Sequence, residues 1–213
     1  MDESLFDATG PEIVTEGAGW HEQPGDRAEL DLTYTAIART RTDAVHELNH
    51  RVAGANPVLD GPGLRVTRRS LRVHNEWRGN RVVGCRAAEE IALLVTDVTV
   101  LEATLSALVA TEPTALHGPR WQLTDPAAGL REAQRLAVED ARRRAEGYAV
   151  ALGGTLGPLR KLSEGLNHAL PAGGYRLAAA EAAGPDVRDL GLEPEPVRVT
   201  AQCTTTWAFL PTQ

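Results

Sequence analysis

Polar and apolar positions alternate strictly in several stretches, a pattern typical of strands with one face on a core and the other in water. Across residues 28–38 the even positions are apolar and the odd positions, apart from Ile37, are polar. The same period predicts long strands over 83–95 and 197–209, and shorter strands at 13–15, 121–123 and 156–162. Between 64 and 77 the phase slips near 68–70, which predicts a β-bulge before a hairpin turn at Gly79-Asn80.

Two short helices are predicted between these strands, because apolar residues there recur at helical spacing. Thr40 or Thr42 is positioned to cap the first helix, over about 43–53. Asp97 is positioned to cap the second, whose apolar side consists of Val98, Leu101, Leu105 and Leu108.

A third, longer helix is predicted to begin at Asp125-Pro126 and to end at Gly153-Gly154. Its predicted buried stripe consists of Leu130, Ala133, Ala137, Ala141, Ala145, Tyr148 and Leu152. On its exposed side, ion pairs four residues apart are expected for Glu139–Arg143 and Asp140–Arg144.

The element order β-β-α-β-β-α-β-α-β-β predicts an α+β fold, with one or more antiparallel sheets and helices packed on one face. We expect a flexible tail at 1–12 and a single domain over 13–210, in which 165–196 form a long loop rich in alanine, glycine and proline. Segments 13–53 and 64–110 share a ββα order, which suggests a degenerate structural repeat.

Composition narrows the range of functions. The formal net charge of −7 argues against a nucleic-acid binder, because such domains carry a basic surface. The longest purely apolar run, Ile91–Val95, is too short to span a membrane, and the acidic first residues do not resemble a signal peptide, so a cytoplasmic protein is expected. Cys85 and Cys203 are not in a CxxC pair; they are interpreted as two buried thiols, with a single bridge as the alternative.

Sequence patterns of catalysis and cofactor binding are missing. Lysine chemistry would depend on Lys161, the only lysine, since an arginine stays protonated and cannot replace it. The sequence contains no GxSxG nucleophile elbow, no Walker A motif and no GxGxxG fingerprint. We therefore assign no catalytic, cofactor-binding or metal-binding residues and expect a protein without enzymatic activity.

One segment, His46-Glu47-Leu48-Asn49-His50, fits the HExxH pattern, in which two histidines bind zinc and the glutamate acts as a base. Helical geometry places His46 and His50 opposite the apolar side formed by Ala44, Leu48 and Val52. A zinc hydrolase needs its histidines in a cleft with a third ligand. The pair is therefore interpreted as solvent-exposed, with weak binding of nickel or zinc and a metal-dependent hydrolase as less favoured alternatives.

Two further groups of residues suggest surfaces. Arginines gather in the predicted hairpin, and we interpret them as the solvated face of a sheet, paired with Glu76, Glu89 and Glu90, rather than as an anion-binding patch: Arg65, Arg68, Arg69, Arg72, Arg78, Arg81 and Arg86. Among the four tryptophans, Trp207 is predicted to lie in the core. Trp20 and Trp77 lie near turns and are candidates for a subunit interface.

The segment from Leu130 to Gly153, with its spaced alanines, its Asp-Ala-Arg step and its terminal Leu-Gly, resembles the signature helix of the SIMPL-domain family. The stretches Val14–Gly19, Pro24–Ala28, Gly84–Ile91 and Gly157–Gly165 resemble that family in the same order, over about residues 12–210. The resemblance implies an α+β fold and a tendency to form oligomers. Family members include bacterial envelope proteins linked to stress responses and a mammalian signalling adaptor, and no shared catalytic residues define the family.

These observations favour a self-assembling scaffold or interaction protein that forms a homo-oligomer. The predicted strands at 28–38 and 197–209 are candidate edge strands, and an unpaired edge needs a partner or a cover. The alternatives are a small-molecule or peptide binding module that uses 165–196 as a lid, and a hydrolase that uses His46 and His50.

Overall fold

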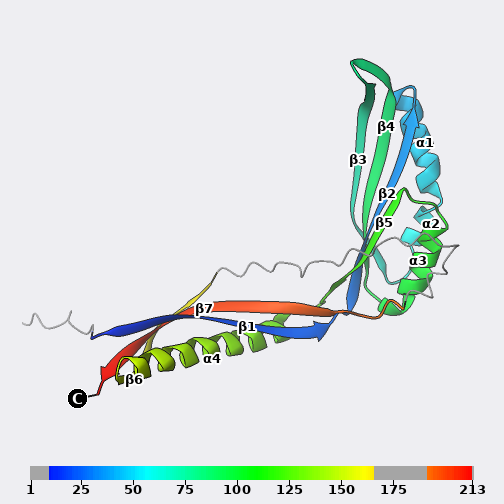
Figure 1. Ribbon diagram of the computed structural model, residues 1–213. Coiled ribbons are helices and arrows are strands. Elements are labelled where there is room, and N and C mark those ends of the chain that lie inside the picture. Colours follow the sequence, from blue (N-terminus) through cyan, green and yellow to red (C-terminus); the bar gives the residue numbers. More distant parts are fainter. Residues whose placement is uncertain (1–9, 166–190, 213) are drawn as a thin grey trace, which may run out of the picture. The chain divides into compact units, whose positions relative to one another are not determined.

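The computed structural model describes residues 10–165 and 191–212, which form two compact units. The four-stranded unit comprises residues 24–124 and 191–196, and the three-stranded unit comprises residues 10–23, 125–165 and 197–212. Each unit has its own sheet and its own helices (Figure 1). The range 13–210, predicted as one domain, is thus divided between two units, and most of the predicted loop at 165–196 lies outside the described residues.

The four-stranded unit is built on an antiparallel sheet with strand order β3-β4-β2-β5. Its strands are β2 (Arg27–Ala38), β3 (Leu64–Arg78), β4 (Arg81–Val95) and β5 (Ala115–Gln122). Strands β3 and β4 meet at the predicted Gly79-Asn80 turn, where Gly79 has a φ of +60°. The predicted bulge lies slightly earlier than expected, between Val66 and Arg68, and a second register shift lies between Glu76 and Trp77.

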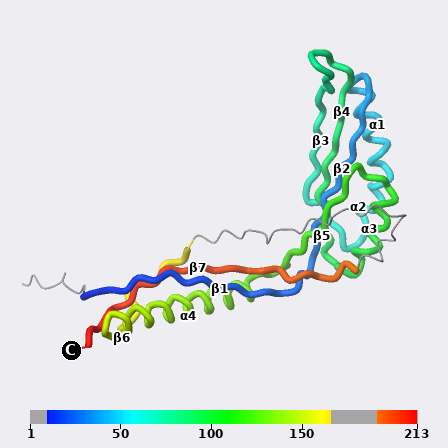
Figure 2. The backbone as a smooth tube through the Cα atoms, viewed as in Figure 1, coloured from blue at the N-terminus to red at the C-terminus, as the bar shows by residue number. Residues whose placement is uncertain are grey.

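Helices cover one face of this sheet (Figures 1 and 2). They are α1 (Arg41–Ala53), the short α2 (Asn56–Leu59) and α3 (Leu101–Val109), which follows the 3-10 turn Val98–Val100. As predicted, Thr40 caps α1 and Asp97 caps the segment before α3. The core lies between the helices and the inward-facing residues of β2 and β4, including Leu30, Leu32, Tyr34, Ile91 and Leu93.

The three-stranded unit is built on a sheet with strand order β1-β7-β6, covered on one face by a long helix. Its strands are β1 (Glu12–Pro24), β6 (Gly154–Glu164) and β7 (Pro196–Pro211), and its helix is α4 (Ala127–Ala151). The backbone trace in Figure 2 shows β1 and β7, which are far apart in sequence, running side by side. With two antiparallel sheets and helices packed against them, the predicted α+β fold is confirmed.

Helix α4 lies unusually close to β1, because only small side chains separate them. Its buried ridge is spaced every four residues: Ala133, Ala137, Ala141, Ala145 and Ala149. Opposite the ridge, a β-carbon on Gly17 would lie 2.0 Å from the Ala137 carbonyl oxygen, and one on Gly19 would lie 2.1 Å from the Ala133 carbonyl oxygen. Glycine is therefore required at both positions.

The prediction that 28–38 and 197–209 are edge strands is wrong. Strand β2 lies between β4 and β5, and β7 lies between β1 and β6. Alternation reports that one face of a strand is buried, and a central strand of a sheet with one covered face alternates just as an edge strand does. The edges of the two sheets are β1 and β6, and β3 and β5.

Three smaller predictions also need correction. In α4, Tyr148 and Leu152 are 60% and 65% exposed, because the buried ridge continues through Ala149 instead. The predicted Asp140–Arg144 pair is present, with 3.1 Å between Nε and Oδ2, but Glu139 pairs with Arg135 rather than Arg143. The suggested ββα repeat does not form, since β1 and β2 belong to different sheets.

Candidate functional site

Strand β1 has a free backbone edge. The carbonyl oxygen of Pro11 faces β7 and accepts a hydrogen bond from Phe209 N–H at 2.8 Å, and that of Thr15 also faces β7, 3.3 Å from the Thr205 hydroxyl oxygen. Ala18 N–H instead donates to Asp140 Oδ2 of α4 at 3.3 Å. Because backbone groups alternate along a strand, the odd positions of β1 face β7 and the even positions face outward. An edge of this kind can pair with another strand.

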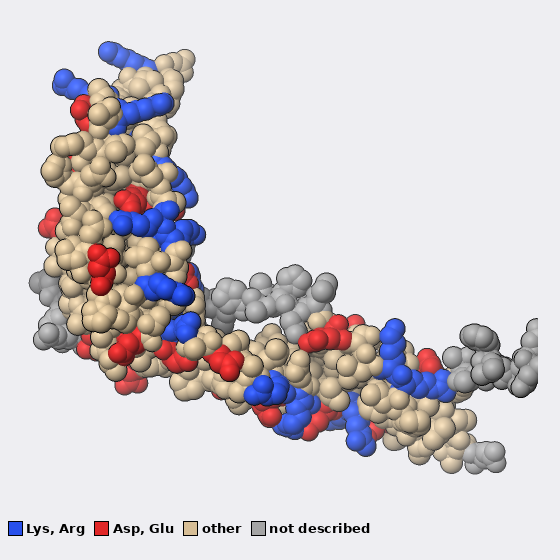
Figure 3. All heavy atoms as spheres, turned by 180° about the vertical axis from the view of Figure 1, so that it is seen from behind, with Lys and Arg blue, Asp and Glu red and all other residues tan. Residues whose placement is uncertain are grey.

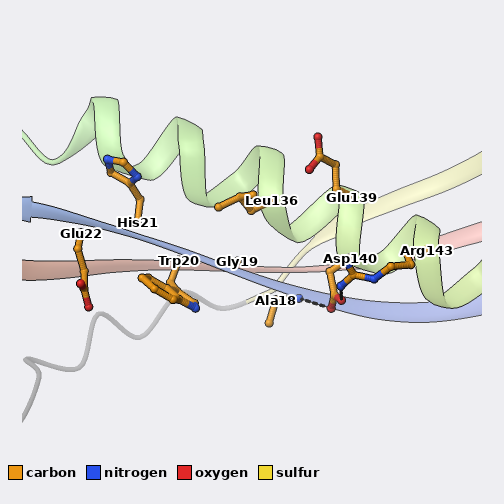
Figure 4. A pocket seen from close by; sticks show the side chains of 9 residues that line it. All are labelled: Ala18, Gly19, Trp20, His21, Glu22, Leu136, Glu139, Asp140 and Arg143. Carbon is orange, nitrogen blue, oxygen red and sulfur yellow. Dashed lines mark hydrogen bonds and ion pairs between the residues drawn. The ribbon is translucent and has the colours of Figure 1, made fainter.

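A hollow of about 450 Å³ follows this edge between β1 and α4 (Figure 4). In the close-up, Leu136 points from the helix toward the strand, and Asp140 extends to the backbone at Ala18. The residues that line the hollow are Ala18, Gly19, Trp20, His21, Glu22, Leu136, Glu139, Asp140 and Arg143. A second chain can therefore approach the edge between residues 18 and 22.

The carboxylates around the hollow are all paired with arginines. Arg198 donates two hydrogen bonds to Glu22, at 2.8 and 3.0 Å, and its guanidinium lies 4.5 Å from the centroid of the Trp20 ring. Arg135 pairs with Glu139, and Arg143 and Arg144 pair with Asp140 at 2.5 and 3.1 Å. Because these charges are matched locally, the outward backbone groups of β1 are the main feature available for recognition.

In the isolated chain, the Asp140 carboxylate is the group that hydrogen-bonds to the backbone at this edge of β1. Burial beside β1 would by itself raise its pKa, but the hydrogen bond from Ala18 N–H and the pairing with Arg143 and Arg144 outweigh burial. Its pKa in the folded protein therefore lies below the usual value. The resulting stabilisation is present above the ordinary aspartate pKa and is lost as pH falls through the folded value.

Replacing Asp140 with asparagine is accordingly expected to lower the free energy of unfolding near neutral pH and to have little effect in strong acid. Asparagine keeps the shape of the side chain and loses the charge that attracts the two arginines. Chemical denaturation of both proteins across the acidic range measures the difference between them. A difference that stays constant from neutral pH down through the aspartate range would contradict this assignment.

The HExxH histidines lie where the sequence predicted. His46 and His50 are on the exposed side of α1, with ring centroids 4.6 Å apart, while Ala44, Leu48 and Val52 are buried. Among the described residues, no group of three or more histidine, cysteine, aspartate or glutamate side chains is placed to hold a metal ion. Hydrolase geometry therefore finds no support in this part of the chain.

Three of the seven arginines noted in the β3–β4 hairpin form the predicted ion pairs with Glu76, Glu89 and Glu90, whereas Arg78 and Arg81 beside its turn have no carboxylate within 4.0 Å among the described residues. Arg69 binds Glu89 at 2.7 Å, Arg72 binds Glu90 at 3.0 Å, and Arg86 binds Glu76. On the sheet face that no helix covers, Arg68 and Arg120 form further ion pairs with Asp31, at 3.6 and 3.3 Å. Exposed pairs of this kind contribute about 0–1 kcal/mol each, so the face is solvated rather than a free anion site.

The tryptophans and cysteines largely follow expectation. Trp207 is buried, as predicted, whereas Trp20 and Trp77 are 53% and 60% exposed. Cys85 and Cys203 are free and buried, so the interpretation as two buried thiols is confirmed. Burial raises the pKa of the Cys203 thiol, which keeps it protonated and unreactive near neutral pH.

Sequence reasoning missed the free edge of β1 and the part that Asp140 plays there. Only residues 13–15 were predicted as a strand, and Gly17-Ala18-Gly19 was interpreted as its end, yet β1 continues to Pro24. The available signal was the pair of glycines two positions apart, which places both on the same face of a strand and indicates close approach of another backbone.

No helix among the described residues is long and apolar enough to span a membrane.

Comparison with known proteins identifies the family. A search of curated proteins finds no match. The model of the SIMPL family, described as a protein of unknown function (DUF541), matches residues 13–207 and thus extends over both units. The resemblance drawn from the sequence is confirmed, and the chain belongs to the SIMPL family.

Proposed function

We propose that this chain is a non-enzymatic, self-assembling interaction protein, and that two copies join by pairing their β1 strands edge to edge. The free, outward-facing backbone of β1 beside an open hollow is the observation that carries this proposal. Pairing would unite two three-stranded sheets into one continuous sheet with matched hydrogen bonds along the former edge.

The other sheet edges are less suited to pairing. Strand β6 contains Pro158 and two register shifts, and β5 contains Pro119 opposite a register shift in β2. Strand β3 carries several arginines and its own register shifts. Prolines, bulges and edge charges are the usual devices against edge pairing. The interior of β1 has no proline, and it runs for 13 residues.

The charges of β1 favour one two-fold register. If two copies pair antiparallel around Ala18, Glu16 faces Trp20 and Val14 faces Glu22 of the other copy. Centring on Gly17 would place Glu12 opposite Glu22, and centring on Gly19 would place Glu16 opposite Glu22. Because like charges directly opposite each other destabilise a sheet, the register around Ala18 is preferred over these two, and it pairs the whole of β1, whereas centring on Trp20 would pair only residues 16–24. An isologous contact of this kind closes as a dimer.

A substitution that blocks the edge tests the proposal directly. Glu16 is exposed and its N–H faces outward, so Glu16→Pro removes a donor from the free edge and leaves the β1–β7 hydrogen bonds in place. We expect the wild-type chain of 22.8 kDa to show twice that mass by light scattering, and Glu16→Pro to weaken the dimer at least about tenfold. The matched control, Glu16→Ala, removes the side chain but keeps the N–H and should dimerise normally.

Asp140 supplies a variant with the opposite expected effect. In the isolated chain its carboxylate occupies Ala18 N–H, so it competes with a partner strand at the centre of the preferred register. Asp140→Ala should therefore strengthen the dimer, and a chelator should leave its mass unchanged. A wild-type chain that stays monomeric at every concentration, or a dimer that Glu16→Pro leaves intact, would overturn the proposal.

A further inference from the structure

The β3–β4 hairpin extends beyond the rest of its sheet. The last residue pair between β2 and β4 is Ala38 with Cys85, so Arg81–Gly84 and the facing end of β3 continue past β2. Figure 1 shows this hairpin end at the outer tip of the four-stranded sheet. The tip is therefore convex, and among the described elements it pairs only with itself.

Apolar side chains are exposed at this tip. Trp77 and Val82 form a cross-strand pair and are 60% and 43% exposed, and the neighbouring Val83 is 53% exposed. We call these three the tip apolar residues. These exposed aromatic and aliphatic side chains are available for contact with another surface.

Arginines surround the tip apolar residues. Arg78 and Arg81 face each other across the hairpin, and Arg39 and Arg41 follow the end of β2 beside Gly84, with Arg41 donating to Asn75 Oδ1 at 3.4 Å. These four are the tip arginines, and in the described part of the chain none has a carboxylate within 4.0 Å. In Figure 3, basic side chains are visible at this end of the unit, and others follow along its length.

The carboxylates nearest the tip along the chain do not cancel this charge. Glu76 is already bound by Arg86, and Asp43 accepts from the Thr40 hydroxyl at 2.8 Å at the start of α1. The positive tip contrasts with the formal net charge of −7 for the whole chain. Because charges are screened over about 8–10 Å at ordinary salt, a contacting surface responds to the tip rather than to the distant net charge.

We propose that the hairpin tip docks on the surface of an anionic phospholipid membrane. Tryptophan favours the interface between headgroups and acyl chains, the two valines add apolar area, and arginines bind lipid phosphates. A single aromatic on a convex surface lacks the stacking platform of a nucleic-acid groove. An anionic lipid surface uses both features at once, because the apolar side chains can enter the region below the headgroups while the uncompensated arginines contact the lipid phosphates. This inference is independent of assembly through β1.

The test uses the full chain and vesicles of phosphatidylcholine with about one quarter phosphatidylserine, compared with pure phosphatidylcholine. We expect wild type to sediment with the anionic vesicles, and the double variant Arg78→Gln/Arg81→Gln to bind them about thirtyfold more weakly. The matched control is Arg65→Gln/Arg131→Gln, which makes the same change in net charge at two exposed arginines outside the tip. This control should bind like wild type.

A second readout reports insertion. Brominated phosphatidylcholine in the anionic vesicles should quench wild-type tryptophan fluorescence more than that of Trp77→Phe. Equal loss of binding in the tip variant and the matched control would overturn the proposal, as would binding without any Trp77-dependent quenching. Arginine-dependent binding to polyglutamate or duplex DNA, without binding to vesicles, would also overturn it and identify a soluble polyanion as the partner.

Discussion

Replacing Gly19 with alanine is expected to destabilise the three-stranded unit by about 3 kcal/mol or more, a large part of the stability of a typical domain. The added β-carbon would lie 2.1 Å from the Ala133 carbonyl oxygen and 2.5 Å from the Ala137 amide nitrogen. Both atoms belong to the backbone of α4, so no side-chain rotation relieves the overlap. The helix must move away from β1 and give up contacts along its alanine ridge.

Chemical denaturation measures this effect, and hydrogen exchange in the α4 peptides assigns it to the correct unit. Gly147→Ala is the matched control, because Gly147 lies in the same helix with nothing within 4 Å of an added β-carbon. Alanine in a helix interior is favoured over glycine, so this control should stabilise by about 0.5–1 kcal/mol. If both variants shifted stability in the same direction, the close contact between α4 and β1 would be wrong.

The sequence predicted where the strands and helices lie along the chain better than it predicted which strands lie side by side in the sheets. A period of two is set by which face is buried, so the strands at 28–38, 83–95 and 197–209 were correctly located. Strand order depends instead on contacts between distant segments, such as the insertion of β7 between β1 and β6. No local pattern carries that information, and both predicted edge strands turned out to be central.

In the candidate site, too, features set within one element could be predicted, and features that depend on distant segments could not. Helical geometry alone placed His46 and His50 on the exposed side of α1, because that prediction depends only on residues within one helix. The free edge of β1 could not be predicted in this way, since it is defined by the strand beside β1 and by Asp140, which is 122 residues away from Ala18. The stripe assigned to α4 failed only at its end, where Ala149 rather than Tyr148 fits the narrow space beside the sheet.

A buried chain of hydrogen bonds links the three-stranded sheet to α4. Trp207 Nε1 donates to the Thr205 hydroxyl at 2.8 Å, and the Thr15 hydroxyl donates to the Ala141 carbonyl oxygen at 2.8 Å. The two hydroxyls lie 3.1 Å apart. Each hydroxyl has one proton, and that of Thr15 is used on Ala141, so Thr205 donates toward Thr15 and accepts from Trp207.

Thr205→Val is therefore expected to destabilise this unit by about 1–3 kcal/mol, although valine matches the shape of threonine. Thr205 is fully buried, and without its hydroxyl the buried Trp207 N–H loses its hydrogen-bond partner. Thr15→Val should have a smaller effect, because the Thr205 proton can turn to the Thr15 carbonyl oxygen at 3.3 Å. Chemical denaturation measures both variants.

Thr200→Val is the matched control, because Thr200 lies on the same strand but is exposed, and it should change stability by no more than about 0.5 kcal/mol. The double variant Thr15→Val/Thr205→Val adds a stricter criterion, because it is expected to be less stable than Thr205→Val alone. Once Thr205 has been replaced, Thr15 still donates to Ala141, so removing it then breaks a bond that the first change left intact. A Thr205→Val protein as stable as wild type would show that the indole N–H is satisfied elsewhere, and the ordered chain from Trp207 to α4 would have to be abandoned.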